Sequence, residues 1–573
     1  MNKIFRFENV KIIIVILSIL AAIKMIFVDY SMDEEYQIMM AYRRLSGDTL
    51  FGTMWEPHQT SAFLTTILLF VYKFITGTVT GCVIFLRVIS TFIRLFLCLA
   101  VCKFVTKTVE SEKIGFFIGA LYFNIVPKLI EIPEFSNLQL WGLTIALLAL
   151  GTWYFERKSL WLILSGIGIS IEVLSYPSDI LNFFFFVVVL LCTKGEKKIK
   201  RLAVFIGTCI AMFALWLLGV LIQTSFDEFI RNIPYILSFD LTHDYTDKFA
   251  SITSMGGDVL KETVLVCLSF LPALGIALLL KKKFIGYFKS IFVISSVLIS
   301  EIIQLIYWFV LQSGYEEAQI HLVVLWLIPV IFIKDIFNSK YRFLYTGIFA
   351  GLLSTVSVIY LSDLTPHYAI PHGLCGGVSS AVLACLIIKK EFETAAVTEV
   401  NQKTEKSLIL ILLLGLTLVS ILGKGLTLRG GRTNTNTVFG ISNIYKKGPA
   451  AFVLADYMQA YINDANYEDF NEYVEDGSNC LIVTEMAGFS GTTPYMFKNL
   501  SVSHFSIVDP TSYDERLLTY WELYPEKQPS VIAIDCWYSN LCIDEDSWIM
   551  KYIEGEYNYT RSEDGRYVRF YFK

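Results

Sequence analysis

The chain has 573 residues, of which 55% are hydrophobic and only 17% are charged. Soluble domains carry about 25% charged residues, so this composition excludes a soluble globular protein and predicts a polytopic membrane protein. The net charge of -5 says little by itself, because the charges are segregated between the two sides of the membrane, and we expect no nucleic-acid partner.

Apolar runs that could cross a hydrocarbon core, which takes roughly 20 residues, recur along the chain. The first, residues 10–28, follows the cationic residues Lys3 and Arg6. We expect an uncleaved helix there, with the N-terminus in the cytoplasm. The later runs are residues 62–75, 83–105, 114–130, 138–155, 160–175, 180–192, 202–222, 259–280, 291–311, 320–333, 343–361, 374–388 and 408–422.

The run at residues 62–75 decides the topology. The Lys- and Arg-rich loops are residues 103–113, 157–158, 194–201, 281–289, 334–342 and 389–406. They all fall on one side only if residues 62–75 do not cross, and this run is short and contains Lys73. We therefore expect an interfacial or re-entrant helix at 62–75 within an outer loop 30–82, and about thirteen transmembrane helices in total.

The polar tail predicts a second domain. Residues 1–424 are expected to form an all-α membrane bundle, and residues 425–573 an extracytoplasmic α/β domain with a partly parallel sheet. Its predicted helices are 450–461, 467–474, 512–524 and 548–555, and its predicted strands are 480–484, 531–535 and 567–572. A disulfide between Cys536 and Cys542 is possible, which would leave Cys480 free. We expect a multi-pass protein of a bacterial plasma membrane.

Carboxylates gather in the expected outer loops. Asp33 and Glu34 follow the first span, and Glu131 and Glu134 lie with Lys128 in the next outer loop. The simpler interpretation is a solvated helix terminus and ordinary interface charges. The functional interpretation is a single pocket on the outer face, because a carboxylate held near lipid can serve as a general base.

Other polar residues near the outer ends are weaker candidates. His58 and Gln59 could hydrogen-bond a sugar or a phosphate. Arg87 and Arg94, seven residues apart on one helix face, could pair with acids or contact a lipid phosphate. Glu172, inside a later span, is expected to face the bundle or to extend toward the outer surface. Lone histidines are assigned structural roles: His321, His367 and His372.

The order of these motifs resembles that of a known family. The chain presents Asp33-Glu34-x-Tyr36, Ala41, Gly47-Asp48, Trp55 and His58-Gln59, then an interfacial helix, an Arg-containing span and Pro133-Glu134. This order resembles the GT-C superfamily of integral-membrane glycosyltransferases, in particular its protein O-mannosyltransferase and aminoarabinose lipid A transferase-like branch. Glu134 stands where that family more usually has Asp. The Arg that the family places before a later span is not matched at residues 319–329.

The resemblance implies transfer of a sugar from a polyprenyl-phosphate donor to a lipid, glycan or protein acceptor on the outer face, with inversion. Asp33 would be the general base, and Glu34 and Glu134 would orient it, bind the sugar or hold a divalent cation. The implied substrate-binding residues are Tyr36, His58, Gln59, Arg87, Lys128 and Glu131. Two alternatives remain open: a transporter or flippase for lipid-linked glycans, and a non-catalytic family member in cell-envelope assembly.

Overall fold

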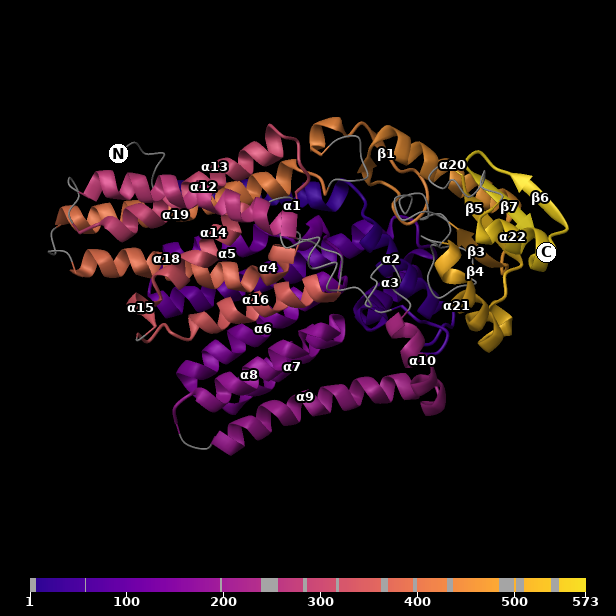
Figure 1. Ribbon diagram of the computed structural model, residues 1–573, viewed down its shortest axis with the longest axis horizontal. Helices are drawn as coiled ribbons and strands as arrows, with labels where there is room; N and C mark the ends of the chain where they lie inside the picture. Colours follow the sequence, from indigo (N-terminus) through magenta and orange to yellow (C-terminus); the bar gives the residue numbers. More distant parts are fainter. Residues whose placement is uncertain are drawn as a thin grey trace.

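The computed structural model describes residues 7–56, 58–195, 198–238, 256–281, 286–315, 319–337, 339–361, 369–394, 399–429, 436–483, 499–500, 510–536 and 546–573. A long helical bundle forms one end of the molecule and a small sheet forms the other (Figure 1). Helices α2 (Met32–Leu45), α3 (Ala62–Thr76) and α10 (Phe226–Ser238) lie between the two. The architecture is that of a polytopic helical membrane protein with a C-terminal α/β unit.

The bundle consists of apolar helices. Within the described ranges, nine helices, α3 among them, are long and apolar enough to cross a membrane by length and composition. The other eight of these, four shorter apolar helices and the 13-residue helix α5 make up the bundle. The bundle helices are α1 (Phe7–Phe27), α4 (Cys82–Val109), α5 (Glu112–Asn124), α6 (Phe135–Glu156), α7 (Ser159–Ser175), α8 (Ile180–Cys192), α9 (Lys198–Leu221), α12 (Gly256–Lys281), α13 (Phe288–Phe309), α14 (Ile320–Ile331), α16 (Leu344–Leu361), α18 (Leu374–Thr394) and α19 (Glu399–Leu426).

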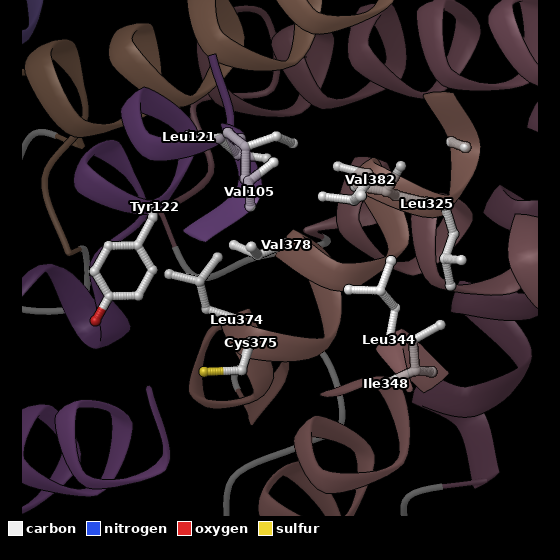
Figure 2. Close-up of a cluster of buried hydrophobic side chains, with 14 of the residues drawn as sticks. Val105, Leu121, Tyr122, Leu325, Leu344, Ile348, Leu374, Cys375, Val378 and Val382 are labelled. Carbon is white, nitrogen blue, oxygen red and sulfur yellow. The ribbon is translucent and has the colours of Figure 1, made fainter. Parts of the chain in front are cut away.

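Helix α18 forms the centre of the bundle. In the most apolar 18-residue stretch of this helix and the turn before it, 94% of the residues are buried. The helix packs against α5, α13, α14, α16 and α19. Figure 2 shows its side chains meeting those of α4, α5, α14 and α16 in one apolar cluster. Gly351 allows α16 to lie close against the start of α18. A Cβ at this position would lie only 2.7 Å from the backbone of Gly373 and of Gly376. This packing fixes the short 3-10 turn Ile370–Gly373, which precedes α18.

Residues 30–82, which the sequence predicts to be an outer loop, contain more helix than expected. Asp33 and Glu34 do not lie at the end of the first span, because α1 ends at Phe27 and a separate helix, α2, begins at Met32. Ser31 caps α2 in extended conformation. Helix α3 occupies the run expected to be interfacial, and its exposed apolar residues include Phe63, Phe70 and Phe74. Whether α3 crosses the membrane or lies along its surface stays a prediction.

The tail forms a five-stranded sheet in the order β4–β3–β5–β7–β6. Strands β4 (Asn499–Leu500), β3 (Asn479–Val483) and β5 (Val531–Asp535) are parallel, whereas β7 (Val568–Phe572) and β6 (Arg561–Asp564) extend the sheet antiparallel. The prediction of a partly parallel sheet is therefore confirmed. A separate short pair, β1 (Asn443–Ile444) and β2 (Leu454–Ala455), precedes it.

The helices of the tail differ in part from the prediction. One helix, α20 (Tyr457–Tyr473), replaces the two predicted at 450–461 and 467–474. Helices α21 (Pro510–Leu523) and α22 (Trp548–Tyr552) lie close to their predicted positions. Cys480 is a buried thiol, and Cys536 is disulfide-bonded. Its predicted partner, Cys542, lies outside the described residues.

A buried cluster of charges joins the tail to the outer loop. The Arg43 guanidinium of α2 bonds Asp48 through Nε and Glu56 through Nη1, both at 2.6 Å, and it donates to the Tyr520 hydroxyl of α21. Lys527, which follows α21, bonds the other Asp48 oxygen at 2.5 Å. Burial favours the neutral acid, but Arg43 and Lys527 outweigh it and hold the pKa of Asp48 below its usual value. We name these five residues the latch.

The latch predicts a large loss of stability when its central cation is removed. Arg43→Ala removes the cation that two buried carboxylates share, although Asp48 keeps its bond to Lys527, and breaking a buried ion pair in this way typically costs about 3–5 kcal/mol. The free energy of unfolding of the purified protein measures the loss. Lys107→Ala is the matched control, because Lys107 forms an exposed pair with Glu156 and such pairs contribute about 0–1 kcal/mol. Equal losses of unfolding free energy in Arg43→Ala and Lys107→Ala would contradict the stabilising role of the latch.

Candidate active site

An ion pair at the C-terminal end of α1 sets the backbone around Asp33. The Arg87 guanidinium of α4 donates to both Glu34 oxygens, at 2.8 and 2.6 Å. Its Nη atoms also donate to four carbonyls at the end of α1: those of Met25, Ile26, Val28 and Asp29. Glu34 in turn accepts from the backbone N–H of Ser31, which completes a capping box at the start of α2. Arg87 thus ties two helix ends together, and all three of its nitrogens are engaged.

Asp33 occupies the first turn of α2 between two cations. Its Oδ2 atom lies 3.1 Å from Lys128 Nζ and 3.0 Å from Arg429 Nη1. The side chains of Asp33 and Arg429 are 15% and 16% exposed, whereas those of Arg87 and Glu34 are 3% and 1% exposed. Asp33 is therefore a carboxylate at a partly open site, and both contacts favour its ionised form.

Lys128 is presented by a constrained loop. Lys128 and Leu129 adopt left-handed backbone angles, with φ of 54° and 50°, a region that costs free energy for residues with side chains. Asn137 holds the loop by donating to the carbonyls of Ile130 and Ile132, both at 2.8 Å. The Lys128 ammonium lies 4.5 Å from the centroid of the Phe135 ring, a cation–π distance. These contacts direct the ammonium toward Asp33.

Glu134 caps α6 beside this centre. Its carboxylate accepts the backbone N–H groups of Ser136 and Asn137 at 2.9 and 2.8 Å. Burial raises the pKa of Glu134 to about 7. Lys128 and the two backbone N–H groups act against this rise, and the charge of Asp33 acts in the same direction as burial. The structure therefore brings Glu134, Lys128 and Asp33 within electrostatic range of one another. Both oxygens of Glu134 are occupied by the helix cap.

The other predicted site residues take mainly packing positions. Glu131 is fully buried and accepts from Arg94 Nε at 3.1 Å. Gln59 is buried and accepts from the backbone N–H of Phe51 at 2.8 Å. The His58 ring stacks on Phe135, with centroids 4.3 Å apart. Tyr36 packs half-buried in the same aromatic group. His58 and Tyr36 pack near Phe135, whose ring also contacts Lys128, and so they lie next to the Asp33 centre. Glu131 is buried in its ion pair with Arg94.

Two residues of the centre were missed by sequence reasoning. Arg429 was not singled out, although a cation directly after the last predicted span, on the side predicted to be outside, departs from the positive-inside rule. His372 was given a structural role. It lies within electrostatic range of Lys128, Asp33 and Arg429, and its Nδ1 atom bonds Gln139 Oε1 at 2.8 Å. Its Nε2 atom is buried and finds no hydrogen-bond partner in the part of the chain that the structure describes.

The described residues around Asp33 contain no clear metal site. Within the described ranges, no three His, Cys, Asp or Glu side chains gather closely enough to hold a metal ion. Glu34 and Glu134 are committed to Arg87 and to the α6 cap. The predicted role of these two acids as cation ligands stays a prediction.

No family model and no curated protein matches the chain. Among solved structures, the chain is similar to the crystal structure of ArnT from Cupriavidus metallidurans bound to undecaprenyl phosphate. The similarity has a TM-score of 0.48 and 9% sequence identity, and it covers 98% of this chain and 97% of that one. The function of this chain has to be inferred from its own side chains.

The raised pKa of Glu134 predicts a pH dependence of stability. A carboxyl whose folded pKa is raised contributes stability below its unfolded pKa, near 4.5, and loses that contribution as the pH rises through about 7. The unfolding midpoint should therefore fall between pH 5 and pH 7.5, by an amount equivalent to at most about 3 kcal/mol.

Glu134→Gln removes the titration and should flatten this pH profile, as thermal unfolding at a series of pH values would measure. Glu156→Gln, at the opposite end of α6, is the control and should leave the profile unchanged. If the unfolding midpoint of Glu134→Gln fell with pH as steeply as that of the unsubstituted protein, Glu134 would not be the titrating group.

Proposed function

We propose that the protein is a glycosyltransferase that moves a sugar from a polyprenyl-phosphate donor to an acceptor on the outer face of the membrane. The observation that carries the proposal is the pairing of Asp33 with both Lys128 and Arg429 at a partly open site. The other acids of this region are committed to buried partners: Glu34 to Arg87, and Glu131 to Arg94.

Lys128 and Arg429 suit a lipid phosphate. Lysine and arginine bind phosphate through charge-assisted hydrogen bonds, and both donors here meet at the same atom, Asp33 Oδ2. A phosphate that engages these two cations would replace Asp33 as their partner. Donor binding would thereby release an ionised carboxylate beside the sugar.

The released carboxylate would act as the general base. Asp33 would accept the proton of the acceptor hydroxyl as the hydroxyl oxygen attacks the anomeric carbon from the face opposite the phosphate. The bond from that carbon to the phosphate oxygen would break, and the configuration would invert. Lys128 and Arg429 would stabilise the negative charge that grows on the leaving lipid phosphate. The polyprenyl chain would remain among the membrane lipids at the side of the bundle.

The remaining neighbours of Asp33 would have positioning roles. Glu134 would keep α6 and Phe135 in place below Lys128, and Glu34 would fix the first turn of α2 through Arg87. His58 and Tyr36, on the far side of Phe135, would border the sugar. The tail would contribute to acceptor recognition, because the latch joins it to α2.

Asp33→Asn tests the base directly. It keeps the size of the side chain but removes the proton acceptor, so the rate of transfer should fall about 10²- to 10⁴-fold. The assay uses the purified full chain with labelled polyprenyl-phosphate sugars and a panel of acceptors. Asp546→Asn, on the exposed surface of the tail, is the control. Unchanged transfer by Asp33→Asn would remove Asp33 as the base, and absent transfer by the unsubstituted protein would favour the transport or non-catalytic alternatives.

Lys128→Met and Arg429→Gln test the phosphate contacts. Each should lower kcat/KM for the donor about 10²- to 10³-fold, because an electrostatic contact to the leaving group is lost. Each should also weaken binding of the polyprenyl phosphate alone. Lys107→Met, at the opposite end of the bundle, should change neither quantity. Normal donor binding by both variants would refute the phosphate site.

A further inference from the structure

A cavity of about 290 Å³ lies between α6, α8 and α16. Ligand pockets begin at about 300 Å³, so its volume approaches that of a small-molecule site. Trp153 lies in the last turn of α6, at the opposite end of this helix from Glu134, so the cavity is separate from the candidate active site. Its walls are largely aromatic and include Trp153, Tyr154, Phe185, Phe343, Tyr345 and Phe349.

The cavity opens toward the exterior of the bundle. Two of its lining residues, Phe337 and Phe349, are 49% and 44% exposed, and an apolar surface of this kind on a membrane bundle is covered by lipid chains. A second cavity of about 70 Å³ lies next to the first, against α18, and shares Leu147 and Phe343 with it. Val378, on its α18 wall, is labelled in Figure 2. A hydrocarbon chain that entered from the side would therefore meet mainly apolar walls.

Three arginines gather at the rim of the larger cavity: Arg157, Arg201 and Arg342. Arg342 lines the cavity directly. The guanidinium carbons of the other two lie 4.7 and 5.9 Å from the centroid of the Trp153 ring, which is a wall of the cavity. The Tyr154 ring lies 5.2 Å from the Arg157 guanidinium and stacks on Phe343, the neighbour of Arg342 in the chain. The rim is therefore strongly basic.

The charge of this rim is not balanced within the described ranges. None of the three arginines forms an ion pair with another described residue. Glu156, the acid next to Arg157, is engaged by Lys107 and Lys158. Arg201 is 6% exposed, and its Nε atom finds no hydrogen-bond partner in the part of the chain that the structure describes. Charges that are left unpaired in this way favour the binding of an anion.

The combination of a basic rim and an apolar interior defines the chemistry of the ligand. Guanidinium groups bind phosphate through strong charge-assisted hydrogen bonds, and basic pockets between transmembrane helices bind the head groups of anionic lipids on the cytoplasmic side. The charge pattern of the sequence predicts that this end of the bundle is cytoplasmic. We propose that the cavity binds one anionic glycerophospholipid, with its phosphate at Arg157 and Arg342 and an acyl chain between α6, α8 and α16.

A polyprenyl phosphate offers similar chemistry, but its proposed site lies at the other end of α6, where Lys128 and Arg429 meet Asp33. A membrane phospholipid is therefore the occupant that fits this end. Its acyl chain would pack against three helices at once and join them. The site does not depend on sugar transfer, so its test needs no sugar donor.

Binding of tritium-labelled dioleoyl phosphatidylglycerol tests the proposal. The full chain, purified in detergent and freed of lipid, should bind one labelled molecule. Unlabelled phosphatidylglycerol should displace the label at least about 10-fold more effectively than phosphatidylcholine with the same chains, because phosphatidylcholine carries no net charge. Arg157→Gln and Arg342→Gln should each weaken binding about 10-fold, since each removes a charge-assisted hydrogen bond to the phosphate. Thr346→Phe, which fills the cavity without a change of charge, should weaken binding as well.

Lys113→Gln is the matched control, because Lys113 is an exposed cation of α5 that does not line the cavity. It should leave binding unchanged. Arg157 and Arg342 are exposed, so their substitution leaves the buried packing of the bundle intact. The proposal is overturned if phosphatidylcholine displaces the label as well as phosphatidylglycerol does, or if the double variant Arg157→Gln/Arg342→Gln binds the label as tightly as the unsubstituted protein. More effective displacement by a polyprenyl phosphate would also overturn it and would assign the cavity to the carrier lipid.

Discussion

The bonds of Arg87 to Glu34 and to the end of α1 are the constraint on which the candidate active site depends. A buried guanidinium is tolerated only when its donors are satisfied, and here one carboxylate and four carbonyls satisfy them. Those partners come from the last turn of α1 and the first turn of α2. Satisfying Arg87 therefore fixes the turn between the two helices, and with it the direction of Asp33.

The four acids of the candidate active site, Asp33, Glu34, Glu131 and Glu134, have different surroundings. Glu34 and Glu131 are buried with arginines, and Glu134 is occupied by two backbone N–H groups. Asp33 alone among these four acids combines partial exposure with two cationic partners. Asp33 could exchange its cationic partners for a ligand, so it is suited to a catalytic role. Glu34, Glu131 and Glu134 bond to groups that hold the fold together, so they are suited to a structural role.

The tail is joined to the bundle at two points that both lead to α2. Arg429, which follows α19 at the start of the tail, bonds Asp33 directly. The latch connects α21 and Lys527 to Arg43 and Asp48 at the end of the same helix. Both ends of α2 are therefore held by residues of the C-terminal part of the chain. A change in the position of the tail would be transmitted to Asp33.

The sequence by itself determined the membrane class, the succession of apolar helices, the partly parallel sheet and the loops that carry Asp33, Lys128 and Glu134. These features follow from local hydropathy and charge, which a bilayer constrains strongly. Only the tertiary structure decided that Arg87 supports the fold, that Arg429 and His372 border Asp33, that Glu172 is buried near Asp179, and that three arginines gather at one cavity. Those facts depend on contacts between segments far apart in the chain, such as Asp33 and Arg429, and no local pattern specifies which distant partner a charge will meet.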